Sequence, residues 1–303
     1  MSERRAEPPT GAPRAGMVWV PGGEFLMGSD DFYPEERPVR REHVHGFWID
    51  AHPVTVTDFD RFVRATGRVT LAERAPSALD YPDADPALLV PGSLVFTPPE
   101  RPVPLDDFRR WWSWVPGASW RAPEGPGSDT DGREDHPVTH VGFDDALAYL
   151  SWAGKALPTE AEWEFAARGG LDGATYPWGD EPTPDGPPRA NTWQGEFPWQ
   201  NTLDDGYART SPVGAFPPNG YGLFDVVGNV WEWTADPYTE PDDTPAAPTA
   251  PCCAAATTAA QFTRHVIKGG SHLCAPSYCL RYRPAARQGE PVDSTTSHLG
   301  FRG

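Results

Sequence analysis

Two cysteines near the C-terminus, Cys274 and Cys279, are the residues of this chain best suited to do chemistry. They lie five positions apart in the segment SHLCAPSYC, with Pro276 between them. Because the residue before a proline is disfavoured in helical geometry, we expect the chain to bend and bring the two sulfurs together. Thiolates are soft ligands that select copper(I), and two sulfurs are too few for structural zinc, which takes about four ligands. The pair is therefore a candidate copper(I) site with room for a further ligand, although the spacing alone favours a plainer interpretation.

The same spacing has a plainer interpretation. Two such cysteines can be buried, inert thiols or a labile disulfide, and C-x4-C alone is weak evidence for a metal. The chain has 4 cysteines in all, which do not make a disulfide framework. The other two, Cys252 and Cys253, adjoin in a low-complexity stretch whose spacing does not fit a zinc pattern. We interpret those two as incidental.

Other side chains that can bind metals or substrates have ordinary explanations. His43 and His45 alternate on one face of a strand at a polar edge, so we interpret both as solvated. His272 lies two positions before the first site cysteine, and we interpret it as a hydrogen-bonded surface residue. Arg281 and Arg283, in the segment RYR, are expected to form structural ion pairs rather than to bind substrate.

The elements that must position these residues are short. The alternation of apolar residues around a Pro-Gly-Gly turn in MVWVPGGEFLMGS predicts a hairpin that begins at Met17, and GFWIDAHPVTV predicts another short strand. Thr57 precedes a helical spacing of apolar residues that ends at Gly67. A second helix is predicted through FDDALAYLSWAG. A third is predicted through LPTEAEWEFAARGG, where Thr159 is the N-cap and Glu162 completes a capping box.

Most of the remaining backbone is expected to be irregular. The chain contains 30 Gly and 37 Pro, and its apolar stretches are short and interrupted. Residues 73–130 are Pro-rich and carry the aromatic cluster WWSWVPGASW, which predicts packed but irregular structure. With 13 Trp, apolar burial should depend on a few large rings. The segment TPAAPTAPCCAAATTAA is predicted to be a surface loop.

Composition limits the classes of partner. The 43 acidic residues against 25 basic ones give a net charge of -18, which repels nucleic acid and favours cationic peptides or metals. No stretch approaches membrane-spanning length, and no apolar run follows the N-terminal arginines. We therefore expect a soluble, cytoplasmic monomer with no membrane partner. Residues 1–16 are predicted to be a disordered leader and residues 17–303 one domain.

Four segments occur in one order: LPTEAEWEFAARGG, FPPNGYGLFDVVGNVWEWTAD, IKGGSHLCAPSYCLRYRPAAR and HLGFRG. Together they resemble the formylglycine-generating, or sulfatase-modifying factor, family in its bacterial type, over nearly all of residues 17–303. The segments GNVWEWT and LGFRG are also similar to the wider fold family. The cysteine pair in SHLCAPSYC is what narrows the resemblance to the formylglycine-generating members. It implies a single compact α+β domain with little regular secondary structure, related to C-type lectin folds. Animal members carry further cysteines where this chain has Pro284 and Gly303, so their structural disulfides should be absent.

The resemblance implies an oxidoreductase that acts on a sulfur group with O2 as acceptor. Its substrate would be the cysteine of a Cys-x-Pro-x-Arg motif in unfolded sulfatases, converted to formylglycine. Copper(I) at Cys274 and Cys279 would take the substrate thiolate as a further ligand. Loss of a hydrogen from the substrate β-carbon would give a thioaldehyde, whose hydrolysis leaves the aldehyde and sulfide, and an external thiol reductant is needed. The resemblance assigns Ser271 and Trp231 to an oxygen pocket and Tyr278 to support of the metal site. The alternative is that Trp231 and Tyr278 only pack in the core.

The resemblance also implies two calcium sites in oxygen-rich turns. The first would use Asn191, Thr192, Asp205 and Tyr207, with the backbone carbonyls of the second and fourth of these residues. The second would use Asp225, Gly228, Val230 and Glu232. The family can have Asn at the first of those positions, so the carboxylate here is expected to alter affinity. Alternatively, the Asx residues only make turns. Bound cations would stabilise a fold with so little regular structure.

Other functions fit parts of this pattern. A non-catalytic binding protein on the same fold, like the animal paralogue that lacks the paired cysteines, is disfavoured because Cys274 and Cys279 are both present. An iron-dependent sulfoxide synthase typically adds a helical domain with a histidine triad, for which this chain has no room. A metal-storage or redox protein would need more cysteines or a resolving partner, and turnover of a peptide distinguishes it from an oxidase.

Overall fold

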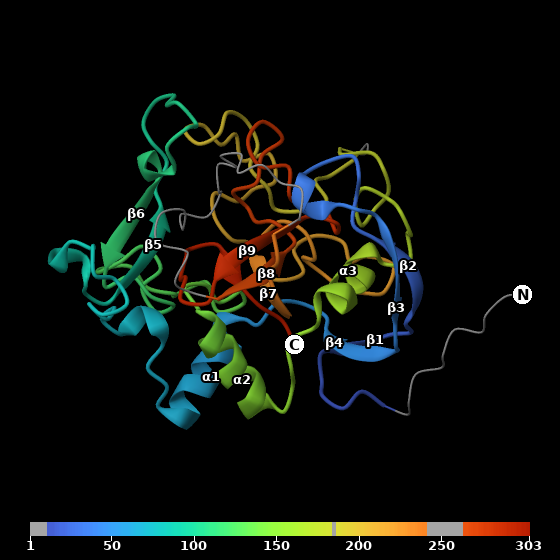
Figure 1. The fold of residues 1–303 in the computed structure, drawn as a ribbon, viewed down its shortest axis with the longest axis horizontal. Coiled ribbons are helices and arrows are strands. Elements are labelled where there is room, and N and C mark those ends of the chain that lie inside the picture. The colour runs from blue at the N-terminus through green and yellow to red at the C-terminus, as the bar shows by residue number, and fades with distance from the viewer. Residues whose placement is uncertain (1–10, 184–185, 241–262) are drawn as a thin grey trace, which may run out of the picture.

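Short elements joined by long turns make up the fold, which is a computed structural model that describes residues 11–183, 186–240 and 263–303 (Figure 1). The predicted loop around Cys252 and Cys253 lies outside the described residues, as do residues 1–10 of the predicted leader. The helices are α1 (Val56–Thr66), α2 (Phe143–Ala153) and α3 (Glu160–Arg168), with 3-10 turns η1 (Pro34–Glu36), η2 (Leu71–Glu73), η3 (Pro86–Leu88) and η4 (Phe108–Arg110). The strands are β1 (Met17–Val20), β2 (Gly23–Met27), β3 (Arg40–Val44), β4 (Phe47–Asp50), β5 (Gly92–Phe96), β6 (Trp112–Pro116), β7 (Trp231–Pro237), β8 (Arg264–Lys268), β9 (Arg287–Pro291) and β10 (Leu299–Gly300).

Local sequence signals determine where the helices begin and end. The Thr159 hydroxyl accepts the Glu162 N–H while the Glu162 carboxylate accepts the Thr159 N–H, so the predicted capping box of α3 is confirmed. Helix α2 matches its prediction and ends at a left-handed glycine. The predicted start of α1 was wrong. Thr55, rather than Thr57, is its N-cap, because the Thr55 hydroxyl accepts the Asp58 N–H.

The predicted N-terminal hairpin has its turn in a different place. Strand β1 pairs with β4 and β2 pairs with β3, both antiparallel and in one continuous register from Met27↔Arg40 to Met17↔Asp50. Residues 17–27 therefore form one arm of a long hairpin, and the Pro-Gly-Gly segment kinks that arm instead of reversing it. A Cβ on Gly22 would lie 2.5 Å from the Val44 carbonyl oxygen, so the kink requires glycine against the opposite arm.

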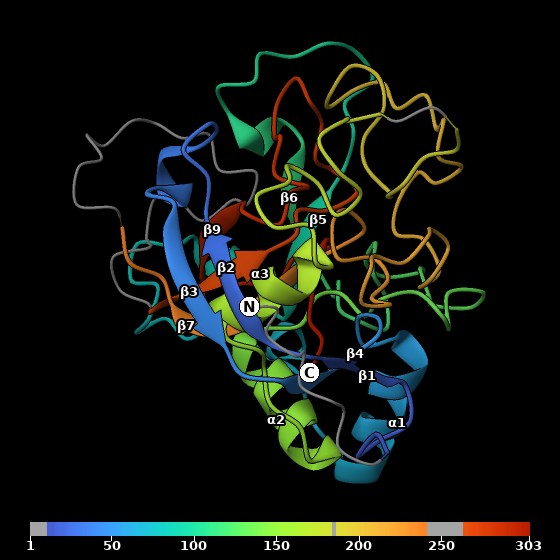
Figure 2. The ribbon, with the colours of Figure 1, turned by 90° about the vertical axis from the view of Figure 1, so that its right-hand side faces the viewer.

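A four-stranded sheet, in the order β10-β7-β8-β9, lies at the centre of the molecule (Figure 1). Strand β10 runs parallel to β7, and the other neighbours are antiparallel. Helix α3 contacts both this sheet and the β2–β3 arms, as Figure 2 shows from the side. The described residues between α3 and β7 contain no helix or strand, which agrees with the predicted low content of regular structure.

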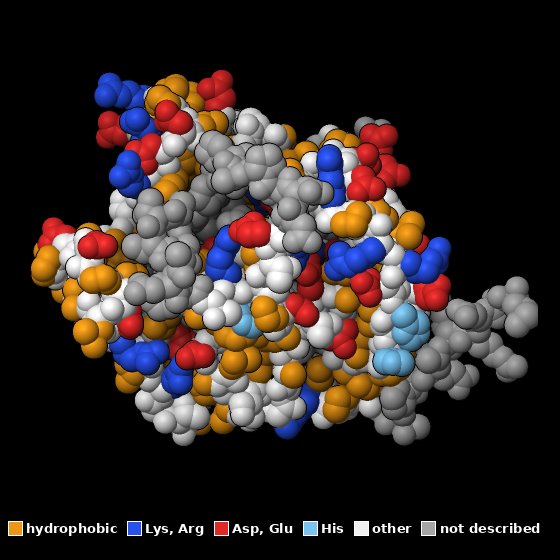
Figure 3. Space-filling view, in the orientation of Figure 1, with side chains coloured by type: hydrophobic (Ala, Val, Ile, Leu, Met, Phe, Trp, Pro, Cys, Tyr) orange, Lys and Arg blue, Asp and Glu red, His pale blue; other side chains and the backbone are white. Residues whose placement is uncertain are grey.

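Large aromatic rings fill the interior, as the tryptophan count predicts. Trp163, Trp231 and Trp233 are among the largest fully buried side chains. The region 73–130 is less irregular than predicted, because β5 and β6 pair as an antiparallel hairpin and place Trp112 in a separate aromatic core. Every helix in the described residues is too short or too polar to cross a membrane. On the face drawn in Figure 3, acidic and basic side chains of the described residues are interspersed.

Candidate active site around two buried cysteines

The loop that carries the cysteines begins at the end of β8 and returns close to its own start. Gly269 and Gly270 have φ angles of 92° and 69°, which residues with a side chain rarely adopt. A Cβ on Gly270 would lie 2.8 Å from the Arg281 carbonyl oxygen. Glycine at this position therefore lets the entry and exit of the loop approach each other, so that the residues between them form a closed turn.

Inside the loop, backbone hydrogen bonds bring the cysteines together. The Cys274 N–H donates to the Ser271 carbonyl at 2.9 Å, and the Cys279 N–H donates to the Ala275 carbonyl at 2.8 Å. The two Sγ atoms lie 3.1 Å apart, and both side chains are buried. That separation exceeds the roughly 2.05 Å of a disulfide, so both are free thiols. The predicted bend at Pro276 is therefore confirmed.

Electrostatics around the sulfurs favours a protonated Cys274 thiol when no cation is present. Burial raises the pKa of Cys274 well above its ordinary value, and the neighbouring Cys279 raises this pKa further. The Ser271 N–H, 3.4 Å from Cys274 Sγ, and the Arg281 guanidinium act in the opposite direction. Arg281 Nη1 lies 4.0 Å from Cys279 Sγ. A soft metal that binds both sulfurs would displace their protons, and Arg281 would partly balance the resulting negative charge.

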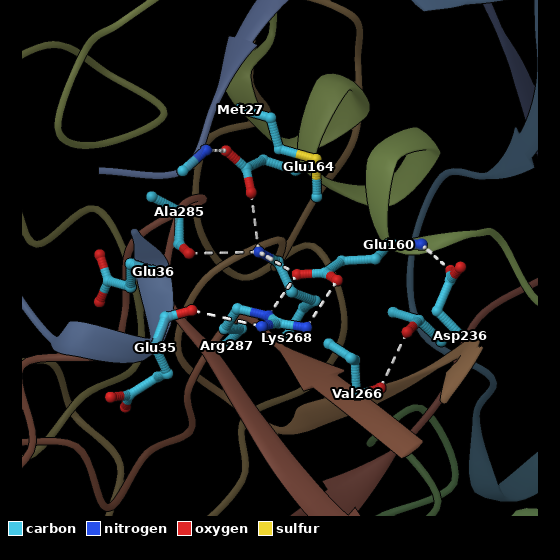
Figure 4. Close-up of polar contacts among 12 residues, drawn as sticks. Met27, Glu35, Glu36, Glu160, Glu164, Asp236, Val266, Lys268, Ala285 and Arg287 are labelled. Atoms are coloured by element: carbon cyan, nitrogen blue, oxygen red, sulfur yellow. Dashed lines mark hydrogen bonds and ion pairs between the residues drawn. The ribbon is translucent and has the colours of Figure 1, made fainter. Parts of the chain in front are cut away.

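A buried ion network holds both ends of this loop (Figure 4). Lys268, the last residue of β8, is fully buried, and its Nζ donates to Glu164 Oε2 at 2.8 Å. Glu164 also accepts hydrogen bonds from Arg168. Arg287 of β9 binds both oxygens of Glu160, at 2.8 and 3.1 Å. Helix α3 thus neutralises two cations that flank the cysteine loop in sequence.

The turn of the N-terminal hairpin, which contains η1, binds the residues that follow Cys279 in the loop. Arg281 donates to Glu35 at 2.6 Å and lies over the Tyr33 ring at 3.8 Å, while Arg283 binds both oxygens of Glu36. The Tyr33 hydroxyl also accepts the Leu280 N–H at 3.0 Å. The predicted structural ion pairs of both arginines are therefore confirmed. Arg281 has an additional place beside Cys279 that the sequence pattern did not indicate.

The other predicted site residues lie in the two cores that meet at the cysteines. Trp231, the first residue of β7, is fully buried in the same core as both cysteines. Its Nε1–H has no hydrogen-bond partner among the described residues. Tyr278 stacks on Phe197 at 4.5 Å and meets Trp111 edge-on at 5.6 Å. Ser271 contacts Cys274 through its N–H, Tyr278 packs against the core that contains both cysteines, and Trp231 belongs to that core.

A family model and several known proteins match this chain over nearly its whole length. A family model, the sulfatase-modifying factor enzyme 1-like domain, matches residues 3–303. The formylglycine-generating enzyme of Mycobacterium tuberculosis is 53% identical over 94% of this chain and 96% of that protein. This chain belongs to the sulfatase-modifying factor family. A Bos taurus member, inactive C-alpha-formylglycine-generating enzyme 2, is 43% identical over 94% of this chain and 86% of that protein. The structure of PvdO from Pseudomonas aeruginosa is similar in fold, with a TM-score of 0.60 and 24% identity over 94% of this chain and 92% of that chain.

Two histidines near the cysteines have places that the sequence interpretation did not predict. His272 is not a surface residue: it is buried, and its Nδ1 lies 2.8 Å from the Asn229 carbonyl oxygen. Burial lowers the pKa of His272 to about 4, so the ring is neutral at physiological pH. His298 was not predicted as a site residue, although it lies in the segment HLGFRG that helped to indicate the family. Its Nδ1 lies 3.0 Å from Ser271 Oγ. His43 and His45, in contrast, are exposed as predicted.

The first calcium site implied by the family has a donor set that fits a hard cation. The Asn191 Oδ1 is buried and has no hydrogen-bond partner among the described residues. Asp205 lies next to it in the fold, with Oδ2 accepting the Thr192 N–H at 3.1 Å and Oδ1 accepting the Tyr207 N–H at 2.9 Å. The Gln194 amide donates to both the Thr192 carbonyl and Asp205 Oδ2, so these two oxygens face one point. A carbonyl oxygen and a carboxylate oxygen that approach one point are the ligand types that Ca²⁺ takes, and we keep this first site as a proposal.

The second implied set fits calcium less well. Both Glu232 oxygens already accept hydrogen bonds from Arg302 at 2.7 Å, and Oε2 also accepts the Trp163 Nε1–H. Burial raises the pKa of Asp225 to about 6, and the Glu232 charge adds to this increase. A cation bound at this second site would have to share the Glu232 carboxylate with Arg302. This second site stays a prediction.

Removal of calcium by a chelator is expected to lower thermal stability without directly removing copper, because the two metals use different ligands. A cation that binds only the folded state stabilises it by about 2.7 kcal/mol when its free concentration is 100 times its Kd. Thermal unfolding followed with calcium and with a chelator should therefore show a lower Tm in chelator. Asp205→Asn should lower the Tm in calcium and reduce the chelator response by the contribution of the first site, whereas the exposed Asp131→Asn should keep the full response. An identical Tm for the native chain in calcium and in chelator would contradict both calcium sites.

Proposed function

We propose that this protein is a formylglycine-generating enzyme. It would oxidise a cysteine in a Cys-x-Pro-x-Arg motif of sulfatases, with copper(I) at Cys274 and Cys279 and O2 as acceptor. The observation that carries the proposal is the pair of buried free thiols, 3.1 Å apart, in a chain 53% identical to a protein of that name. Two adjacent soft donors suit copper(I), and they leave it unsaturated, so a substrate thiolate has a place to bind.

Bound copper would supply a one-electron route from the substrate thiolate to O2. The chain itself contributes the sulfurs, the Arg281 charge and a dry environment. The raised pKa of Cys274 supports this division of roles, because a buried thiol without a metal stays protonated and unreactive. Oxidation of the substrate supplies only part of the electrons that reduce O2 to water. An external thiol therefore has to supply the remainder.

Three side chains are proposed to surround the reacting atoms. The buried Trp231 Nε1–H is a donor without a partner among the described residues, and such groups call for an explanation. Ser271 is linked to Trp231 through His298, whose carbonyl oxygen accepts the Trp231 backbone N–H and whose ring contacts the Ser271 hydroxyl. Tyr278 forms an aromatic wall with Phe197 and Trp111, which supports the metal site by excluding water. We propose Ser271 and Trp231 as the oxygen pocket and Tyr278 as its support.

A hollow beside the loop is the proposed place for a client peptide. Its volume is about 420 Å³, and it is bordered by Pro276 and Ser277, which lie between the cysteines, and by Trp193. One acidic and one basic side chain, Asp204 and Arg189, also line it. We propose that its aromatic side chains contact the proline of the peptide and that Asp204 pairs with the arginine, with the peptide cysteine directed toward the loop that carries the thiol pair.

Three further features are proposals of the same kind. We propose a reducing, cytoplasmic location, where Cys274 and Cys279 would stay available to a metal. We further propose that the protein acts as a monomer, and that its mixture of helices and strands is an α+β fold related to C-type lectins.

A non-catalytic binding protein is the second candidate, because the inactive Bos taurus relative is similar over most of this chain. Overall identity does not separate the two functions. The thiol pair favours the enzyme, because a binding protein has no need of a soft metal site.

Peptide affinity separates the proposed chemistry from simple binding. Under anaerobic conditions, copper-loaded protein should bind a Cys-x-Pro-x-Arg peptide much more tightly than the matching Ser-x-Pro-x-Arg peptide, because serine lacks the soft donor. Metal-free protein should discriminate less, since the proline and arginine contacts are the same in both peptides. Isothermal titration measures all four affinities. If copper gives the cysteine peptide no advantage, the substrate does not meet the metal through sulfur and the proposed mechanism has to be abandoned.

A further inference from the structure

His298 connects the two residues of the proposed oxygen pocket. It directly precedes β10, and its carbonyl oxygen accepts the Trp231 N–H at 2.8 Å. Its ring nitrogen Nδ1 lies 3.0 Å from Ser271 Oγ. The Ser271 N–H in turn donates to Cys274 Sγ at 3.4 Å. One residue therefore contacts the backbone of Trp231 and the hydroxyl of Ser271, and only Ser271 separates it from the thiol pair.

The His298 ring is held in place and is uncharged. It is fully buried, and the Trp112 ring meets it edge-on at 4.8 Å. Burial lowers the pKa of His298 well below its ordinary value, and the nearby His272 and His140 rings lower it further. A neutral imidazole carries one N–H, either on Nδ1 or on Nε2. The location of that hydrogen decides what the Ser271 hydroxyl can do.

Hydrogen-bond accounting at Ser271 Oγ distinguishes the two possibilities. A hydroxyl has one hydrogen and two acceptor sites. The Leu273 N–H already donates to Oγ at 3.2 Å. If His298 Nδ1–H donates as well, both acceptor sites are filled and the hydroxyl hydrogen is available to another molecule. If Nδ1 instead accepts, the hydroxyl hydrogen is directed to His298 and Ser271 has no hydrogen to offer.

We propose that His298 is a positioning residue whose Nδ1–H donates to Ser271 Oγ and keeps the Ser271 hydroxyl hydrogen free for an oxygen species reduced beside Cys274. This inference rests on the proposed function of the site. A preorganised donor aimed at developing negative charge contributes roughly 10²- to 10³-fold in rate. His298 controls only the orientation of that donor, so its loss should lower the rate roughly 10- to 100-fold.

Two replacements of similar size test the role of the ring nitrogen. The Asn side chain in His298→Asn places an amide N–H where Nδ1–H lies, whereas His298→Leu fills similar space without a hydrogen bond. His298→Leu should lower kcat/KM for O2 roughly 10- to 100-fold, while the KM for peptide and the copper(I) stoichiometry stay unchanged. His298→Asn should recover most of that loss. In a Ser271→Ala background, His298→Leu should cause little further loss, because the hydroxyl it orients is absent. Equal rates for the Asn and Leu variants, or fully additive losses with Ser271→Ala, would overturn the proposal.

A spectroscopic measurement on metal-free protein is independent of turnover. In protein with ¹⁵N-labelled histidine, the His298 signals are those that disappear in His298→Asn. Long-range ¹H–¹⁵N correlation should show a protonated Nδ1 and an unprotonated Nε2. Protonation at Nε2 instead would overturn the proposal even if the variants lost activity. If native protein forms no aldehyde but Nδ1 is protonated, the proposed function fails while the assigned hydrogen bond stands.

Discussion

Cys274→Ser and Cys279→Ser are each expected to abolish tight copper(I) binding and to lower aldehyde formation by on the order of 10³-fold or more. Serine has nearly the same size as cysteine, but its hydroxyl is a hard, weakly acidic ligand that copper(I) does not select. Because the two sulfurs lie 3.1 Å apart, removal of either one leaves a single soft donor. The double variant should therefore be little worse than either single variant, since the two thiols act as one unit.

The chain offers a matched control for this result. Cys252 lies outside the described residues, in the segment interpreted as incidental, so Cys252→Ser should bind copper(I) and turn over peptide like the native chain. Competition with a chromophoric copper(I) chelator measures the affinity of each variant. Equal copper(I) affinity of Cys274→Ser and the native chain would refute the assignment of the site.

The largest expected loss of stability comes from Glu164. Removing one partner of a buried ion pair leaves an uncompensated charge, which costs about 3–5 kcal/mol. Glu164→Ala removes the carboxylate of the buried Arg168 and the nearer carboxylate of the buried Lys268, which keeps Glu160 at 3.8 Å, and it also removes an acceptor of the Gly28 N–H. Chemical denaturation should show a loss of this size in the free energy of unfolding. Because Lys268 begins the cysteine loop, copper(I) affinity should fall as well.

An exposed pair provides the comparison. Arg41 and Glu24 lie 3.2 Å apart with side chains that are 67% and 57% exposed, so Glu24→Ala should change the free energy of unfolding by less than about 1 kcal/mol. Similar losses for Glu164→Ala and Glu24→Ala would contradict the importance of the buried network.

The pH dependence of the same network has a definite sign. Burial alone would raise the pKa of Glu164, but Lys268 and Arg168 more than offset it, so the pKa lies below its ordinary value. Glu164 therefore contributes stability that is present above the unfolded pKa and is lost as the pH falls through the folded pKa. The network accordingly contributes to stability at neutral pH.

Signals that act over a few residues could be predicted from the sequence. Thr159 and Glu162 specify the start of α3 because each bonds the backbone of the other three residues away. The bend at Pro276 is equally local, and it brings Cys274 to Cys279. The hairpin turn was placed wrongly at the Pro-Gly-Gly segment, because a glycine pair that kinks a strand has the same pattern as one that reverses it.

Contacts between distant parts of the chain could not be predicted in this way. Arg281 and Glu35 are separated by 246 positions, and nothing in either segment indicates the other. Histidine at position 272, between a serine and a leucine, gives no local sign of burial. Its burial depends on the distant Asn229 segment, whose carbonyl oxygen contacts the His272 ring. His298 was missed for the same reason, since its importance depends on the approach of β10 to β7 and to Ser271.

The central claim is tested most directly by the mass of a product peptide. Copper-loaded protein is incubated with a Cys-x-Pro-x-Arg peptide, O2 and a thiol reductant, with Cys279→Ser as the inactive control. The account predicts a copper- and oxygen-dependent product in which the cysteine thiol and one hydrogen are replaced by an aldehyde oxygen, and which reacts with a hydrazide probe. A peptide that binds but keeps its original mass, with fully copper-loaded protein and O2 present, would contradict the account and would favour the non-catalytic binding protein.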